Sequence, residues 1–278
     1  MSLLDAVVLG IVQGVTEFLP ISSTAHLTIA GRLMGLVRAD APAEWTATIA
    51  IIQLGTAASV LVYFRAEIVA MAGALAADLG DLPRAVREGF RPDSRLAFLI
   101  AIGTVPIVIL GLLLKRVIEG ELTKDPVVIA WSLIMLAAML FWAERAGRRT
   151  RTLGEKSAAD ALLVGLAQAV ALVPGASRSG TTITAGLFLG FTREAAARFS
   201  FLLSIPAVLA SGFYELYEAR DQIAQGGAAF LVLAVLSSAV TGYLAIEFLL
   251  RFLRRHSTMV FIVYRILLGA ALLLFAAA

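Results

Sequence analysis

The chain has 278 residues, of which 60% are apolar and only 15% are charged. A soluble domain with an ordinary charged surface does not have this balance, so the composition indicates a chain that resides in a bilayer. The formal net charge is only +3 and the arginines lie in short loops, which argues against a nucleic-acid partner. The absence of cysteine excludes disulfides, thiolate metal sites and a cysteine nucleophile.

Six apolar stretches each approach the roughly 20 residues that a helix needs to cross a bilayer. They lie around residues 45–64, 96–114, 126–143, 199–214, 228–250 and 259–276. Two further apolar segments are interrupted, residues 3–35 at Pro20 and residues 158–190 at Pro174 and Gly175. We therefore predict an all-α polytopic membrane protein with six transmembrane helices and two re-entrant helical hairpins.

The two interrupted segments resemble each other in sequence. Five positions match at a constant offset of 155 residues, pairing Asp5, Ala6, Gly10, Gln13 and Val15 with Asp160, Ala161, Gly165, Gln168 and Val170. After a slip of one residue, Pro20 aligns with Pro174 and Ser23 with Ser177. Because the matches fall on helix breakers and polar residues, we interpret them as an internal repeat.

Three predicted spans follow each interrupted segment, so the two segments enter the bilayer from opposite faces. We expect one integral membrane domain over residues 1–278, in which inverted repeats of about 1–144 and 158–278 are joined by a cytoplasmic linker at 145–157. Repeats of this kind place a binding site near the midplane, between discontinuous helices whose N-termini face anionic groups.

Loop charges predict the orientation, because cytoplasmic loops carry an excess of lysine and arginine. Three loops qualify, with Arg84, Arg87, Arg91 and Arg95, with Arg145, Arg148, Arg149, Arg151 and Lys156, and with Arg251, Arg254 and Arg255. The more acidic loop at 215–227 and both termini are then external. The loop that holds Lys115, Arg116 and Lys124 fits this arrangement less well.

The first interrupted segment places a carboxylate, three hydroxyls and an imidazole at membrane depth. The polar residues are Gln13, Glu17, Ser22, Ser23, Thr24 and His26. Ionisable groups in such a position normally face a water-filled cavity and mark a functional site. Gln13 and Glu17 share one helix face, and the hydroxyls after Pro20 can cap the next helix. The alternative is that the serines only cap a helix and His26 packs against a neighbouring span.

The second interrupted segment has the composition of an anion-binding turn. Gly175 and Gly180 allow backbone N–H groups to approach a ligand, and Arg178 supplies a planar fork for phosphate oxygens. Three hydroxyl groups can complete the site, those of Ser177, Ser179 and Thr182. The alternative is a positive-inside arginine beside a close helix contact at Gly180.

Other polar and aromatic residues receive structural interpretations. Glu247 and Arg251 are spaced to pair near the end of a span. The interfacial aromatic belt is assigned Tyr63, Trp142, Tyr214 and Tyr264.

At its two interrupted segments the sequence resembles the bacterial undecaprenyl pyrophosphate phosphatase family, the bacitracin-resistance type. That family carries Glu/Gln-x3-Glu with Pro-x-Ser-Ser-Thr, and Pro-Gly-x-Ser-Arg-Ser; here these are Gln13 to His26 and Pro174 to Thr182. The resemblance implies removal of one phosphate from C55-isoprenyl pyrophosphate, which recycles the carrier lipid of cell-wall synthesis in the bacterial cytoplasmic (inner) membrane. It also implies a divalent cation, Mg²⁺ or Ca²⁺, and suggests a homodimer.

By position, the resemblance implies that Glu17, Ser22, Ser23, Thr24, His26, Ser177, Arg178, Ser179 and Thr182 are functional. Within this set, Ser23 is the candidate nucleophile and Glu17 the group that positions or deprotonates it. His26 is the expected proton donor to the departing phosphate, and Arg178 offsets charge on the phosphoryl group. Glu17 and Gln13 are the expected metal ligands, although glutamine at position 13 weakens a two-carboxylate site.

Two alternatives stay open. A metal-activated water can attack in place of Ser23. A lipid flippase or transporter can bind the same headgroup without cleaving it, since inverted repeats with broken helices are common in transporters. The site is expected to open to the external side of the membrane.

Overall fold

Six helices are long and apolar enough to cross a membrane, as the sequence predicts. They are α3 (Pro42–Tyr63), α6 (Pro92–Leu113), α8 (Pro126–Ala146), α11 (Arg193–Glu218), α13 (Ala228–Arg255) and α14 (Met259–Ala277). Three of them begin with proline in the first turn, where its missing N–H leaves no helical hydrogen bond unmade. The predicted class, an all-α polytopic membrane protein, is confirmed.

The structure is a computed structural model that describes residues 2–38, 40–220 and 227–277. No β-strand occurs in this part of the chain. Residues 221–226, in the acidic loop predicted to be external, lie outside the described residues. The shorter helices not belonging to the interrupted segments are α4 (Arg65–Gly80), α5 (Leu82–Glu88), α7 (Lys115–Glu119), η1 (Glu121–Lys124) and η2 (Leu153–Glu155).

Each interrupted segment forms two short helices joined by a turn. The pairs are α1 (Leu3–Phe18) with α2 (Ser23–Leu33), and α9 (Ala158–Val170) with α10 (Arg178–Phe188). The predicted breaks at Pro20 and at Pro174 and Gly175 fall within these two turns. The re-entrant course of the two pairs through a bilayer stays a prediction.

Backbone geometry fixes how the two pairs correspond. Ser22 and Ser177 are the N-cap residues of α2 and α10, and both have a left-handed backbone, with φ of 74° and 68°. Each accepts a hydrogen bond on its Oγ from the backbone N–H three residues later. The offset of 155 therefore continues through the serine turn. The predicted one-residue slip that paired Ser23 with Ser177 is wrong, and the structural counterpart of Ser23 is Arg178.

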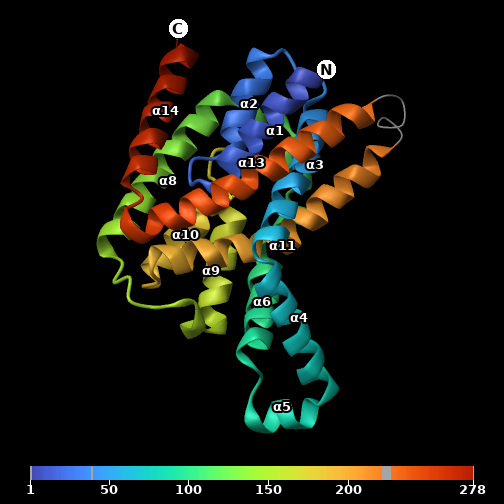
Figure 1. Ribbon diagram of the computed structural model, residues 1–278. Coiled ribbons are helices and arrows are strands. Elements are labelled where there is room, and N and C mark those ends of the chain that lie inside the picture. Colours follow the sequence, from blue (N-terminus) through green and yellow to red (C-terminus); the bar gives the residue numbers. More distant parts are fainter. Residues whose placement is uncertain (1, 39, 221–226, 278) are drawn as a thin grey trace.

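The broken pair of each half packs on a span of the other half. Helix α1 lies along α13 and helix α9 along α6. Close approach requires glycine: a Cβ at Gly14 would overlap Thr241 of α13, and one at Gly165 would overlap Gly103 of α6. Helix α1 starts near the N-terminus, whereas α9 starts beside the linker at the other end of the bundle (Figure 1). The two pairs thus begin on opposite sides.

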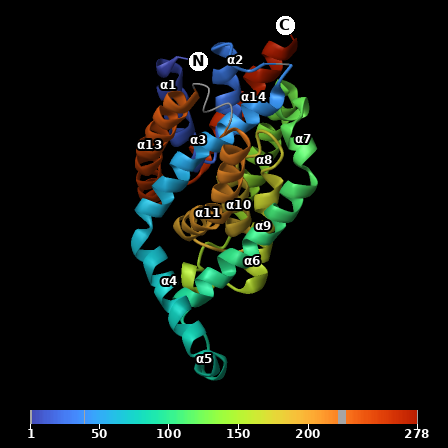
Figure 2. The same cartoon turned by 90° about the vertical axis from the view of Figure 1, so that its right-hand side faces the viewer.

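The three arginine-rich stretches gather on one side, away from the two termini (Figure 1). Buried Glu144 of α8 links two of them, because it accepts hydrogen bonds from Arg149 of the linker and from Thr258 at the α13–α14 junction. Helix α5, which carries Arg84 and Arg87 of the third stretch, projects with α4 beyond the bundle on the same side (Figure 2). This common side is what the cytoplasmic assignment of these loops requires.

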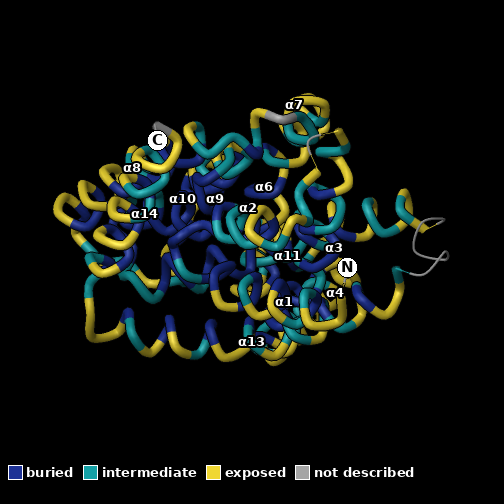
Figure 3. Tube along the Cα trace, turned by 90° about the horizontal axis from the view of Figure 1, so that it is seen from above, coloured by how far each residue is buried: buried dark blue, intermediate teal, exposed yellow. Residues whose placement is uncertain are grey.

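Buried residues concentrate in the middle of the bundle, around α2, α9 and α10. The outer helices have many exposed residues (Figure 3). The exposed side chains of α6, α8 and α14 are mostly large and apolar, as a hydrocarbon environment demands. The polar residues of both interrupted segments therefore lie in the interior, surrounded by spans with apolar outer surfaces.

Candidate active site

Glu17 is the centre of the candidate site. It lies in the last turn of α1 and is only 5% exposed. Its Oε1 accepts a hydrogen bond from the Nη2 of Arg178 at 2.6 Å. Its Oε2 accepts from the Oγ of Ser23 at 2.6 Å and from the Nε2 of Gln13 at 2.8 Å. One carboxylate thus joins α1, α2 and α10, across 161 residues of sequence between Glu17 and Arg178.

Arg178 is the first residue of α10 and points from that helix toward α1. Its Nη1 also donates to the carbonyl oxygen of Ser204 at 3.2 Å, and the side chain is 14% exposed. A buried charge needs such partners, since removal of one member of a buried ion pair costs about 3 to 5 kcal/mol. A guanidinium has five N–H donors, so two contacts leave donors for phosphate oxygens.

The two adjacent serines have different partners. The Oγ of Ser22 accepts from the backbone N–H of Ala25 at 3.3 Å, which is a capping contact. The Oγ of Ser23 donates to Glu17 instead, and so it is the hydroxyl placed beside a base. The structure therefore supports the choice of Ser23 by its contact with the carboxylate, and not by the sequence match to Ser177.

The hydroxyls of the second turn tie the two broken pairs together. The Oγ of Ser179 donates to the carbonyl oxygen of Leu19 at 3.1 Å and lies 3.2 Å from the Oγ of Ser177. Thr182 hydrogen-bonds Ser200 of α11 at 2.6 Å, one turn further into α10. The side chain of Thr24 makes no hydrogen bond to the described residues. The hydroxyls of the two N-cap serines, Ser22 and Ser177, each accept a hydrogen bond from a backbone N–H. The N-termini of α2 and α10 meet here, a geometry that favours anions.

His26 does not touch Glu17, Ser23 or Arg178 among the described contacts. Its Nδ1 lies 2.6 Å from the carbonyl oxygen of Ser22, and its Nε2 lies 2.6 Å from the hydroxyl of Tyr264 on α14. The predicted place of Tyr264 in the interfacial belt is therefore incomplete, because its hydroxyl points to the site. Sequence spacing gave no sign of this contact, which joins residues 238 positions apart.

Arg265 is the residue that the sequence analysis missed. It is fully buried in α14, and its guanidinium donates to the carbonyl oxygens of Pro20 and Ala176 at 3.3 and 3.1 Å, one in each turn. It also donates to the carbonyl oxygens of Gly175 and Leu133. The signal was present, since a lone arginine inside an apolar span is the same feature that identified Arg178.

Gly180 makes a close contact, which was the alternative interpretation of this position. A Cβ at this position would meet the guanidinium of Arg265 and the side chain of Ser177. Glycine is therefore needed here so that Arg265 can reach the two turns, and the predicted approach of the backbone to a ligand stays a prediction. The contact between Glu247 and Arg251 is present as predicted, and Glu247 also accepts from Tyr63.

The oxygen groups of the site suit a divalent cation that takes most of its ligands from substrate and water. The Oε1 of Gln13 is buried without a hydrogen-bond partner, four residues before the carboxylate of Glu17. No cluster of three or more acidic, histidine or cysteine side chains that could hold a metal occurs within the described residues. Mg²⁺ is usually bound by one or two carboxylates together with phosphate oxygens, so one carboxylate and one amide oxygen fit it.

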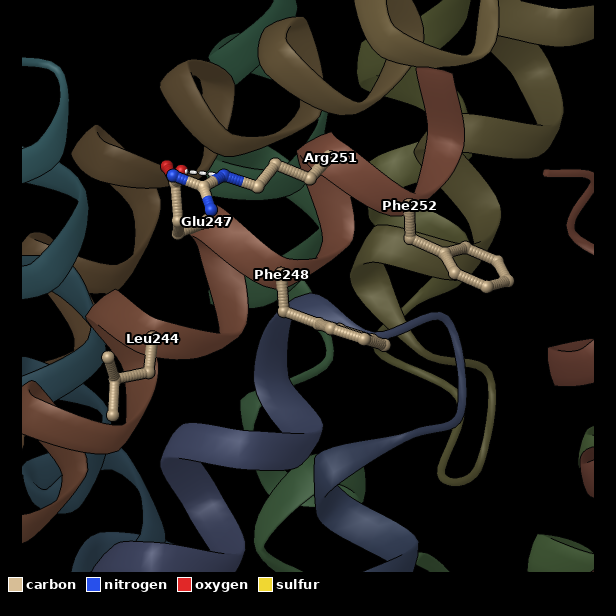
Figure 4. A pocket seen from close by; sticks show the side chains of 5 residues that line it. All are labelled: Leu244, Glu247, Phe248, Arg251 and Phe252. Atoms are coloured by element: carbon tan, nitrogen blue, oxygen red, sulfur yellow. Dashed lines mark ion pairs between the residues drawn. The ribbon is translucent and has the colours of Figure 1, made fainter. Parts of the chain in front are cut away.

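A shallow pocket of about 440 Å³ lies away from this site, on the outer face of α13. Its lining comes from a single helix face, as Figure 4 shows, and consists of Leu244, Glu247, Phe248, Arg251 and Phe252. None of the candidate site residues lines it. This pocket is therefore not part of the candidate site.

The fold and these contacts define a class of protein: an integral membrane protein whose polar site is enclosed between two broken helix pairs. The chain belongs to the family described as bacitracin resistance protein BacA, which matches residues 6–271. An undecaprenyl-diphosphatase of Syntrophobacter fumaroxidans is 55% identical over 98% of this chain and 97% of its own length. Those of Chlorobium phaeobacteroides and Myxococcus xanthus are each 49% identical over 98% of this chain, covering 96% and 89% of their own lengths.

Proposed function

We infer that this protein is an undecaprenyl-diphosphatase, which hydrolyses undecaprenyl pyrophosphate to the lipid monophosphate and phosphate and so recycles the cell-wall carrier lipid. Family membership and relatives of that name at about half identity over the whole chain support it. The structural observation that carries the inference is the Oγ of Ser23 donating to Glu17 at 2.6 Å, beside Arg178. A site that only binds pyrophosphate needs no such serine and base.

The proposed reaction begins at Ser23. Its Oγ attacks the terminal phosphorus and its proton passes to Glu17, while the bond from that phosphorus to the bridging oxygen breaks and lipid monophosphate departs. Water then hydrolyses the phosphoserine to free phosphate. Protonation of Glu17 weakens its pairing with Arg178, whose charge then becomes available to the phosphoryl oxygens. The N-termini of α2 and α10 act in the same direction.

The remaining polar residues receive supporting roles in this proposal. Ser22 and Ser177 hold the two turns as N-caps, while Ser179 and Thr182 fix α10 against its neighbours. The hydroxyl of Thr24 and the remaining donors of the turns bind phosphate oxygens. His26 is the proposed proton donor to the departing lipid phosphate; its Nε2 would first take up a proton from solvent and then exchange its contact with Tyr264 for one with that group.

We propose that a divalent cation, Mg²⁺ or Ca²⁺, binds at Glu17 and Gln13 together with the substrate. When bound, it would offset negative charge on the pyrophosphate oxygens. Binding is tested without turnover by thermal unfolding of the Ser23→Ala protein in the presence of substrate: the cation should raise the midpoint of that protein. Gln13→Ala added to this variant should reduce that rise. An equal rise in both proteins would remove Gln13 from the metal site.

The rival function is a flippase or transporter that binds the lipid headgroup without cleaving it. The decisive experiment is phosphate release from a prenyl pyrophosphate by the purified protein in detergent, with Ser23→Ala as the matched negative control. We expect release that depends on Ser23. Binding of the substrate without release by the native protein would favour the transporter.

The protein is a multi-pass membrane protein. We propose that it lies in the bacterial cytoplasmic (inner) membrane and that its site opens to the external side. In this cysteine-free chain, a cysteine at Ser2 should react with an impermeant reagent in intact cells, while one at Thr150 should be protected. The reverse pattern would invert the orientation. The proposed partners are the lipid substrate and membrane lipid, with no nucleic acid, and a homodimer stays a prediction.

A further inference from the structure

The contact between His26 and Tyr264 belongs to the resting site, because His26 must give it up to reach the departing phosphate, and His26 lies one helical turn from Ser23. His26 is on α2 and Tyr264 is on α14, so the contact joins the first interrupted segment to the last span. It has two components. The hydroxyl lies 2.6 Å from Nε2, and the two rings are stacked with centroids 5.6 Å apart and an angle of 11° between their planes.

The partners of the imidazole define its tautomer. The carbonyl oxygen of Ser22, 2.6 Å from Nδ1, can only accept a hydrogen bond, so Nδ1 carries a proton. In the neutral ring Nε2 then has a free lone pair and accepts from the hydroxyl of Tyr264. Both nitrogens are thereby satisfied, and the stacked ring blocks rotation of the imidazole.

Tyr264 is itself held in place by its neighbour. Arg265 is anchored to carbonyl oxygens of both turns and to that of Leu133, which fixes the rotation and height of α14 relative to α2. Tyr264 is 41% exposed, so burial does not immobilise it. Its ordered position follows from the adjacent anchor and from the contact with His26.

We propose that Tyr264 is a positioning residue for His26: its hydroxyl and ring hold the neutral imidazole with Nδ1 protonated toward the Ser22 carbonyl and Nε2 turned toward the site edge. The inference rests on the proposed function for its kinetic consequence only. Its structural content, a hydrogen bond at Nε2, can be measured in the resting protein.

The spectroscopic test uses the low histidine content of the chain. The only other histidine is His256, so His256→Gln leaves a single imidazole for ¹⁵N-histidine NMR in detergent. We expect a protonated Nδ1 and a hydrogen-bonded Nε2. Tyr264→Phe, which keeps the stacked ring, should move the Nε2 resonance toward that of a nitrogen without a hydrogen bond. An unchanged resonance would overturn the proposal.

The kinetic test compares Tyr264→Phe with Tyr214→Phe, in the full-length protein. Tyr214 also has a hydrogen-bonded hydroxyl, 2.6 Å from the Nζ of Lys115, but lies outside the site. Tyr264→Phe should lower kcat by roughly five- to tenfold with KM changed less than about twofold, as expected when one hydrogen bond that orients a catalytic imidazole is lost. Tyr214→Phe should leave both values unchanged.

The two kinds of failure are distinguishable. A native protein that releases no phosphate contradicts the proposed function and leaves the NMR result as the test of the contact. An active native protein in which Tyr264→Phe retains full kcat contradicts the positioning role. Loss of thermal stability in Tyr264→Phe equal to that in Tyr264→Leu, together with unchanged kcat per folded molecule, would assign Tyr264 to packing alone.

Discussion

The turn between α1 and α2 and the turn between α9 and α10 share one local geometry and carry different side chains. In both, a serine with positive φ caps the second helix. Gln13 has its counterpart in Gln168, and both side chains are fully buried. At the offset of 155, however, Leu172 stands where Glu17 stands in the first pair.

The difference assigns separate tasks to the two pairs. The first helical position after the serine cap is Ser23 in α2 and Arg178 in α10, and both side chains reach the same carboxylate of Glu17. The first pair thus supplies the base and the hydroxyl, and the second supplies the positively charged arginine. Because the second pair has a leucine and not a carboxylate at the position of Glu17, the repeat forms one site between its halves and not one site in each.

Removal of the carboxylate should have the largest effect. Glu17→Gln removes the acceptor of the Ser23 proton and leaves Arg178 buried without its ion-pair partner, so kcat/KM should fall roughly thousandfold. The measurement is phosphate release by purified protein. Glu247→Gln is the control, since it removes a carboxylate of α13 outside the site, and turnover should change less than about twofold. Comparable losses in both variants would deny Glu17 a special role.

The next largest effect is expected at Arg265, which hydrogen-bonds both turns. Arg265→Met removes donors from carbonyl oxygens in both turns and should destabilise the protein by about 3 kcal/mol, because buried acceptors are left unpaired. Thermal or denaturant unfolding in detergent measures this. Arg254→Gln, which breaks an exposed pair with Glu194, should cost no more than about 1 kcal/mol. Equal stability of the two variants would mean that Arg265 does not hold the turns.

The role of Arg178 in the second pair can be tested by a smaller change. Arg178→Lys keeps the charge but loses the planar fork, so kcat/KM should fall at least about tenfold, equivalent to roughly 1.4 kcal/mol. The assay compares this variant with the native protein at saturating and limiting substrate. Near-normal turnover would remove Arg178 from the site.

The residues that precede the two helix pairs differ as well. Helices α1 and α9 both begin with a serine and aspartate capping box, but only α9 is preceded by a buried lysine. Burial, with the charge of Arg198 nearby, lowers the pKa of Lys156 to about 7. The unfolded chain, with a lysine pKa of 10.5, binds this proton more readily. The resulting destabilisation is complete below pH 7 and disappears as the pH rises to 10.5.

Lys156→Met should therefore stabilise the protein by roughly 1 kcal/mol at pH 6, with a gain that shrinks as the pH is raised toward 10. Unfolding of both proteins in detergent across that range measures the effect. A difference that does not vary with pH would show that the lysine is not buried in its neutral form.

Much of this arrangement was predictable because it depends on local chemistry. Apolar length located six spans, and Pro20 and Pro174 located the breaks. Polar residues inside apolar runs identified Glu17 and Arg178 as candidate site residues, and the structure places the two in contact. The pairing itself was not predictable, since it depends on how α1 and α10 pack.

The errors also have physical causes. The one-residue slip followed matching prolines, but backbone φ at Ser22 and Ser177 decides the correspondence, and φ is not visible in a sequence. Tyr264 was assigned to the belt because tyrosines near span ends usually belong there. Arg265 was passed over although the rule that selected Arg178 applied to it equally.

In the proposed mechanism Ser23, activated by Glu17, attacks the phosphorus. The most direct measurement is an acid quench of single turnover with prenyl pyrophosphate labelled at the terminal phosphate, followed by location of the label in the chain. We expect phosphoserine at Ser23, no label or turnover in Ser23→Ala, and measurable turnover in Ser22→Ala, where a cap worth about 1 kcal/mol is lost. Substantial turnover by Ser23→Ala with a divalent cation present would contradict this mechanism and favour attack by water.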